Sequence, residues 1–127
     1  MTAVLDASAV LAWLRDEPGA EEVHPLLGTA VMSAANWSET WQKLARHGVD
    51  ADRATSRLRT LGLRVEPVTE ADAVTAARLW TRTRTAGLSL GDRCCLALGV
   101  RLELPAVTAD TAWAGLGLDE ITVQVIR

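Results

Sequence analysis

Residues 1–14 read MTAVLDASAVLAWL, an apolar run that a single charge, Asp6, interrupts. The segment Thr2 to Leu5 predicts a short β-strand, and Ser8 to Arg15 carries apolar residues at helical spacing. Burying an unpaired charge costs roughly several kcal/mol, so Asp6 is expected either at the edge of the core or beside a partner. The stretch therefore predicts a strand that ends at an acid and is followed at once by a helix.

The rest of the chain continues this alternation of strands and helices. Further strands are predicted at 30–32, 64–68, 105–110 and 121–126. Helices are predicted at 20–27 (interrupted by Pro25), 33–48, 51–62, 69–87, 89–102 and briefly around Trp113. Strands separated by helices require crossover connections. The sequence therefore predicts an α/β fold, a three-layer α/β/α sandwich with a mostly parallel sheet of four to five strands.

Two helices are expected to place apolar residues on one face. In the helix at 33–48, Trp37, Trp41 and Leu44 fall on one stripe, and Glu39 lies on the opposite, solvated side. In the helix at 51–62, the residues expected to face inward are Ala51, Ala54, Leu58 and Leu61.

Length and composition indicate one globular domain spanning residues 1–127. The chain is 49% apolar and 23% charged, and it holds no apolar run of the ~18 residues that a membrane span needs. It also lacks a secretory signal, so a cytoplasmic protein is expected. The adjacent cysteines, Cys94 and Cys95, are expected to be reduced and packed, because neighbours in a helix point to different sides.

The net charge of −3 conceals an uneven distribution of charges. Between Arg53 and Arg101 there are nine arginines against four acids. This segment suits either a contact with a phosphate backbone or an ordinary solvated helix surface.

Four acids from distant parts of the chain are predicted at the starts of helices. Asp6 and Asp110 each end a strand, while Asp92 and Glu39 lie in the first turns of their helices. Ligands of open parallel sheets bind outside the carboxyl ends of the strands, where these acids are expected to meet. Helix capping and the helix dipole also favour acids at such positions, so position alone leaves both roles open.

Carboxylates grouped without histidine or cysteine ligands suit a hard divalent cation, Mg²⁺ or Mn²⁺. Such an ion relieves the repulsion among the acids and activates water for attack on a phosphoryl group. The chain has no glycine-rich phosphate loop and no recognisable Ser-His-Asp set. Ser8 is therefore expected to cap a helix or to donate a hydrogen bond in a metal site.

Four motifs in this order resemble the PIN domain, and specifically the VapC-type toxins of bacterial toxin–antitoxin pairs. They are LDASAVLAWL, the helix that carries Glu39, LSLGDRCCLALG and VTADTAW, and together they cover essentially the whole chain. The resemblance implies a small nuclease that cuts RNA with Mg²⁺ or Mn²⁺. It places the family's acids on Asp6, Glu39, Asp92 and Asp110, with Asp6, Asp92 and Asp110 on the metal.

The same resemblance implies supporting hydroxyls at Ser8 and Thr108, and an anchoring role for Trp113 where the family often has Phe. It further implies a homodimer and a cognate VapB-type antitoxin that covers the site. Arg82, Arg84 and Arg93 are candidates to bind the phosphates that flank the cleaved bond in RNA.

Two other classes of function remain open on the sequence. One is a PIN-like dimeric module that binds a partner and has lost its catalytic activity. The other is a phosphoacceptor signalling domain, which requires paired acids after the first strand and a lysine near the end of the chain. Here Asp6 stands alone and Lys43 lies within a helix.

Overall fold

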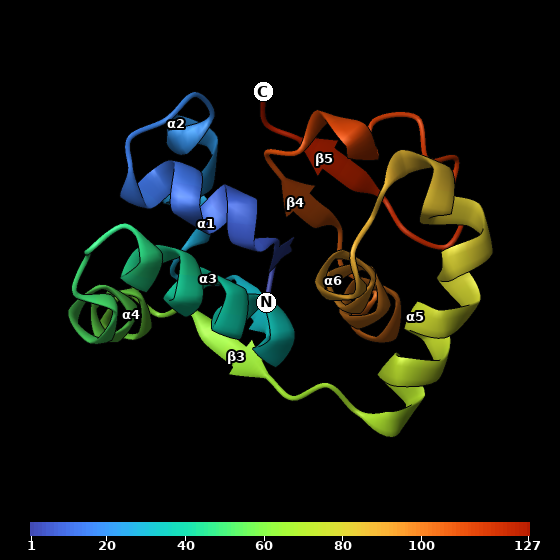
Figure 1. Ribbon diagram of the computed structural model, residues 1–127, viewed down its shortest axis with the longest axis horizontal. Coiled ribbons are helices and arrows are strands. Elements are labelled where there is room, and N and C mark those ends of the chain that lie inside the picture. The colour runs from blue at the N-terminus through green and yellow to red at the C-terminus, as the bar shows by residue number, and fades with distance from the viewer.

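The structure, a computed structural model, describes residues 1–127 and contains one five-stranded sheet (Figure 1). The strands are β1 (Val4–Leu5), β2 (Val31–Ser33), β3 (Arg64–Glu66), β4 (Ala106–Thr108) and β5 (Val123–Val125). They lie in the order β3-β2-β1-β4-β5, and every neighbouring pair is parallel. The predicted α/β class is therefore confirmed, with β1 at the centre of the sheet.

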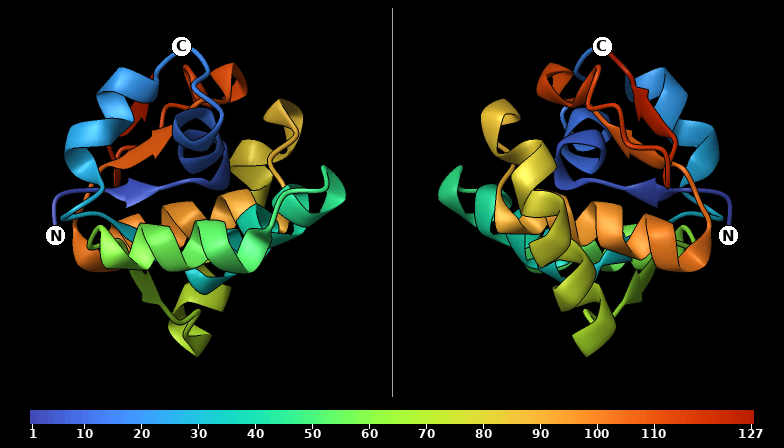
Figure 2. Two further views of the ribbon diagram at one scale, coloured as in Figure 1. Left: turned by 90° about the vertical axis from the view of Figure 1, so that its left-hand side faces the viewer. Right: turned by 90° about the vertical axis from the view of Figure 1, so that its right-hand side faces the viewer.

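Helices occupy the connections between the strands. They are α1 (Ala7–Leu14), α2 (Ala20–Val23), α3 (Ala34–Arg46), α4 (Ala51–Thr60), α5 (Glu70–Thr83) and α6 (Leu90–Leu102), with 3₁₀ turns η1 (His24–Leu26), η2 (Arg84–Ala86) and η3 (Thr111–Trp113). Helices α1 to α4 lie to the left of the sheet in Figure 1, and α5 and α6 lie to its right. Figure 2 shows these two groups from either side.

The period of two along each strand divides the core between the two faces of the sheet. Leu5, Met32 and Val107 pack into one cluster with residues of α1, α2 and α4. Their neighbours Val4, Val31 and Ala106 pack into a second cluster with residues of α5 and α6. Both faces are covered, which explains why these strands are largely apolar and do not alternate between apolar and polar residues.

The ends of α6 and α5 show how local signals set the helix boundaries. Ser89 caps α6 in a capping box with Asp92, and Thr69 does the same for α5 with Asp72. Gly87 closes the segment after α5 in the left-handed conformation, with a φ of 73°. The structure thus confirms the predicted starts of both helices.

The structure corrects one residue on each of two predicted helix faces, while Leu44, Ala51 and Leu58 are buried as predicted. The buried residues of α3 are Asn36, Thr40 and Leu44, whereas Trp41 is 43% exposed. In α4 the expected inward residue Leu61 lies beyond the helix end and is also 43% exposed. The prediction for α3 counted only apolar side chains, while α3 turns a partly polar face inward.

Three smaller predictions also have outcomes. Pro25 ends the regular part of the predicted helix at 20–27, which continues as the turn η1. Cys94 and Cys95 are free and buried, as expected, and burial raises the pKa of both thiols. Trp113 is 1% exposed and packs in the α5 and α6 cluster, as an anchoring residue would.

Candidate metal centre

Asp6 lies at the carboxyl end of the central strand β1, where the chain turns into α1. Its backbone N–H donates to the carbonyl of Val107 on β4 at 2.9 Å, and the residue is 3% exposed. Although Asp6 occupies the N-cap position of α1, its side chain caps no backbone group. Capping therefore does not explain the carboxylate.

Two hydroxyl groups hold the Asp6 carboxylate instead. Ser8 Oγ donates to Asp6 Oδ2 at 2.6 Å, and Thr108 Oγ1 donates to the same oxygen at 3.0 Å. Each hydroxyl also accepts a backbone N–H from the segment after β4, from Ala109 at 2.9 Å and from Asp110 at 3.0 Å respectively. The network ties the end of β4 to the end of β1 and fixes one oxygen of Asp6.

Asp92 and Asp110 combine a capping role with exposure to the same space. Asp92 Oδ2 accepts the backbone N–H of Ser89 at 2.9 Å, and Asp110 Oδ1 accepts that of Ala112 at 2.9 Å. The capping role that the sequence allowed is therefore real for both residues. In each of them the second carboxylate oxygen has no hydrogen-bond partner within the protein.

Glu39 reaches the site because α3 packs against the start of α6. Asn36, fully buried, donates from Nδ2 to Glu39 Oε1 at 2.8 Å and to the Gly91 carbonyl at 3.0 Å. A Cβ at Gly91 would lie 2.5 Å from Glu39 Oε1, so glycine at this position makes room for the carboxylate. Glu39 is half-buried beside Asp92's helix, which corrects the prediction that it is solvated.

These side chains line one cavity of about 300 Å³, formed by residues Asp6, Ala7, Ser8, Glu39, Lys43, Ser89, Asp92 and Asp110. The structure thus brings together the four acids and Ser8 that the sequence singled out, with Thr108 bonded behind Asp6. Lys43 also lines this cavity, although its sequence context did not predict it there. Its position one helical turn after Glu39 was the available signal.

Burial and like charge act together on Asp6. The pKa of Asp6 is raised from an ordinary value of 3.8 to about 6, chiefly by burial; the hydroxyl bonds from Ser8 and Thr108 oppose this rise, and the charges of Asp92 and Glu39 add to it. None of the four acids is in a salt bridge, since the ion pairs of the protein join Arg82 to Glu120, Arg101 to Asp72 and Arg127 to Glu17. The cavity therefore concentrates negative charge that no protein cation neutralises by contact.

The donor set fits a hard divalent cation in type, because it consists only of oxygen atoms. Asp6, Glu39, Asp92 and Asp110 each retain one carboxylate oxygen without a protein hydrogen bond. No three His, Cys, Asp or Glu side chains converge closely enough to form a complete ligand cluster. Mg²⁺ is compatible with such a site, since it usually keeps several waters and takes only one or two carboxylates directly.

The three arginines predicted to contact RNA lie outside this cavity. Arg82 pairs with Glu120, and Arg84 stacks over Trp80 with 5.2 Å between its guanidinium carbon and the ring centroid. Arg93 donates to the carbonyl of Ala76 at 2.8 Å. Their contact with phosphates stays a prediction.

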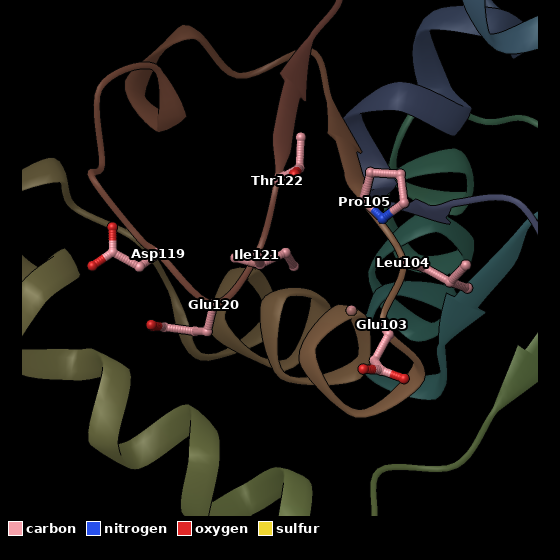
Figure 3. A pocket seen from close by; sticks show the side chains of 8 residues that line it. Glu103, Leu104, Pro105, Asp119, Glu120, Ile121 and Thr122 are labelled. Atoms are coloured by element: carbon pink, nitrogen blue, oxygen red, sulfur yellow. The ribbon is translucent and has the colours of Figure 1, made fainter.

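A second acidic cavity of about 270 Å³ lies at the opposite end of the sheet (Figure 3). Glu103, Asp119 and Glu120 supply its acids, beside Pro105 and Thr122, which precede β4 and β5. All three acids are exposed, and Glu120 is neutralised by Arg82. Like the first cavity, this cavity is lined by acids. Unlike Asp6, however, these acids are exposed, and one of them is in an ion pair.

A parallel sheet with acids from four segments at its carboxyl end defines a class of α/β protein with a candidate hydrolytic metal site. The chain belongs to the PIN domain family, whose model matches residues 3–117.

No curated protein sequence matches the chain. Every helix is too short or too polar to cross a membrane.

Three solved structures show the same fold at low sequence identity. A toxin-antitoxin complex from Klebsiella pneumoniae is 16% identical, with a TM-score of 0.73 over 95% of this chain and 99% of the other. VapC20 of Mycobacterium tuberculosis, described as a toxin that cleaves the sarcin-ricin loop, is 19% identical with a TM-score of 0.70 over 95% and 99%. FitAcB from Neisseria gonorrhoeae is 22% identical with a TM-score of 0.70 over 97% and 96%.

Proposed function

We propose that this protein is a metal-dependent endoribonuclease and the toxin of a VapBC-type toxin–antitoxin pair. The observation that carries the proposal is the single cavity lined by Asp6, Glu39, Asp92 and Asp110, whose carboxylates have no cationic partner. Membership of the PIN domain family and the toxin and toxin–antitoxin structures that share the fold support the same function.

Asp6, Asp92 and Asp110 would hold Mg²⁺ or Mn²⁺ through their free oxygens, with Glu39 acting directly or through water. When bound, a divalent cation supplies an activated water and stabilises the charge that develops on a phosphodiester during hydrolysis. Because no three acids converge closely, we expect water molecules to complete the coordination shell.

The protein's own residues prepare the site for this cation. Ser8 and Thr108 donate to one oxygen of Asp6 and leave the other without a hydrogen bond. Asn36 holds Glu39 against the first turn of α6. A carboxylate that is fixed before binding loses less conformational freedom when the cation and the RNA arrive.

The proposal includes the partners that the family resemblance implies. A VapB-type antitoxin would cover the acidic cavity, and a homodimer would be the working form of the toxin. Since both RNA and the antitoxin are cytoplasmic in such a pair, the protein would act in the cytoplasm.

Expression in a bacterial host tests the proposal directly. The chain is expressed alone, as Asp6→Asn, and together with the neighbouring reading frame, and growth and RNA integrity are measured. We expect the wild type to arrest growth and degrade a defined RNA, the variant to do neither, and the neighbour to rescue growth. Full toxicity of Asp6→Asn would contradict the proposed site.

A further inference from the structure

A second cavity of about 330 Å³ adjoins the acidic cavity and carries the opposite charge. Its lining includes Arg15, Lys43, Arg46, His47 and Arg127, with Glu17 as the single acid. Ser8 and Lys43 line both cavities, so the two form one continuous groove. We call the part lined by Arg15, Lys43, Arg46 and His47 the basic groove.

Two neighbouring helices build this groove from regular stripes. Glu39 and Lys43 on α3 and His47 at its C-cap recur every four residues. Ser8 and Leu11 on α1 and Arg15 at its C-cap recur at three and four residues. Both helices run away from the sheet in the same direction (Figure 1). The groove therefore begins at the acids and becomes basic over about 10 Å, the length of seven residues of helix.

The cations of the basic groove are not neutralised within the protein. Lys43 and Arg46 make no side-chain hydrogen bond and no salt bridge, and Arg15 has no carboxylate partner. Glu17, the acid of this cavity, is already paired with Arg127 at 3.1 Å. Three positive charges thus face the groove with no protein anion in contact.

Arg15 is also held only loosely by its neighbour. Its Nη2 lies 3.1 Å from His47 Nδ1, which lies 2.8 Å from the Lys43 carbonyl. A single ring nitrogen either accepts from Arg15 or donates to the carbonyl, and it cannot do both. When His47 donates to the Lys43 carbonyl, the Arg15 guanidinium is free to bind an incoming anion.

The helix dipoles account for part of this arrangement. Arg15 follows α1, and Lys43 and Arg46 lie in the last turn of α3, where cations stabilise a helix through its dipole. That role does not require the two helix ends to line one groove, or the groove to open into the acidic cavity. Binding of a nucleic-acid strand explains both features. The cleaved phosphate and the phosphates next to it lie on one strand, so their binding sites must be continuous.

We infer that the basic groove binds the backbone phosphates of single-stranded RNA next to the phosphate that is cleaved. The inference rests on the proposed function and assigns the phosphate contacts to Arg15, Lys43 and Arg46 rather than to the arginine-rich segment between Arg53 and Arg101. It also fixes the path of the strand, which would run between α1 and α3.

The test measures RNA binding separately from cleavage. A labelled single-stranded RNA of 12 nucleotides is titrated in EDTA, where a metal-dependent nuclease cannot cut it, and anisotropy reports binding. The groove variant combines Arg15→Ala, Lys43→Ala and Arg46→Ala. The control combines Arg53→Ala, Arg64→Ala and Arg78→Ala, exposed residues without side-chain partners, and changes the net charge equally.

We expect the groove variant to bind RNA at least tenfold more weakly than the wild type, and the control less than twofold. Loss of three phosphate contacts should also reduce the slope of log K against log salt by roughly 2. Equal weakening in both variants, greater weakening in the control, or no RNA binding by the wild type would overturn the inference. Circular dichroism shows whether each variant is folded. If the triple variant is unfolded, the single variant Lys43→Gln is titrated with RNA in its place.

Cleavage assays in Mg²⁺ distinguish failure of this inference from failure of the proposed function. If the wild type cuts RNA and the groove variant has an unchanged KM, the basic groove does not bind the substrate, while the proposed nuclease activity is supported. If the wild type binds RNA through the basic groove but does not cut it, the proposed nuclease activity is wrong, while the inferred RNA binding by the groove is supported.

Discussion

Both ends of the sheet carry an acidic cavity, but the acids at the two ends have different surroundings. At the carboxyl end, Asp6 is buried and the acids have no ion-pair partner. At the amino end, Asp119 and Glu120 are exposed, and Arg82 pairs with Glu120. Acidity alone therefore does not mark a site. The signal is unpaired acids held in place by dedicated hydrogen bonds.

The largest contrast is expected in cleavage. Asp6→Asn should lower the rate of Mg²⁺-dependent RNA cleavage by roughly 10³-fold or more, because it removes a carboxylate that would hold the divalent cation. The matched variant Asp119→Asn, in the amino-end cavity, should cleave at the wild-type rate. A fluorescent RNA assay measures both, and comparable losses would remove the distinction between the two ends.

The next contrast concerns stability and has opposite signs at the two ends. Asp6 binds its proton more tightly in the folded protein than in the unfolded chain. Its ionisation therefore lowers the free energy of unfolding progressively as the pH rises from 3.8 to about 6, and the full loss is present above pH 6. Asp6→Asn should therefore raise the free energy of unfolding at pH 7.5 by up to about 3 kcal/mol. Urea unfolding at pH 7.5 and pH 4 should show the gain disappear at the lower pH.

At the amino end, Arg82 lowers the pKa of Glu120, so its ionised form supports folding at neutral pH. That support is present above the ordinary value of 4.5 and is lost as the pH falls through the lowered pKa. Glu120→Gln should slightly destabilise the protein at pH 7.5, because the ion pair is largely exposed. If Glu120→Gln stabilises the protein at pH 7.5, or if Asp6→Asn destabilises it, the predicted opposite effects of the two acids on stability are wrong.

Metal binding gives the third contrast. Mg²⁺ at 100 times its dissociation constant should stabilise the wild type by about 2.7 kcal/mol and raise its Tm by roughly 10 °C. Glu120→Gln should keep this shift, and Asp6→Asn should lose most of it. Differential scanning fluorimetry measures the shift, and an equal response in both variants would place the ion elsewhere.

The smallest contrast uses two glycines of α6. A Cβ at Gly91 meets the flexible end of Glu39, so Gly91→Ala should leave the fold intact and lower cleavage about tenfold by displacing that carboxylate. A Cβ at Gly99 would overlap the Ile121 side chain and lie 3.0 Å from the Leu104 carbonyl, so Gly99→Ala should cost about 1–3 kcal/mol. Urea unfolding and cleavage rates separate the two effects, and a destabilised Gly91→Ala would contradict the flexible contact.

The sequence was sufficient for the features that depend on neighbours along the chain. The alternation of strands and helices predicted the parallel sheet, and Ser89 and Gly87 marked real boundaries. Asp6 and Asp110 were found because junctions after parallel strands meet at one edge of a sheet, and Asp92 was found from its position in the first turn of a helix. These inferences needed no knowledge of which helices touch.

The sequence failed where one helix packs on another. Periodicity placed Glu39 in solvent because it treats the apolar stripe as the buried one, whereas α3 buries Asn36 and Thr40 against its neighbours. The basic groove was missed for a similar reason. Arg15 and His47 are 32 residues apart, and only the packing of α1 beside α3 brings them together.

The hydroxyl of Thr108 that holds Asp6 comes from 102 residues further along the chain. During synthesis at about 5–20 residues per second, Asp6 waits roughly 5–20 s before β4 exists to pair with its strand. The candidate metal centre is therefore incomplete on a nascent chain that ends before Asp110. If the protein is a toxin, a ribosome that stalls before residue 106 releases a fragment that cannot cut RNA.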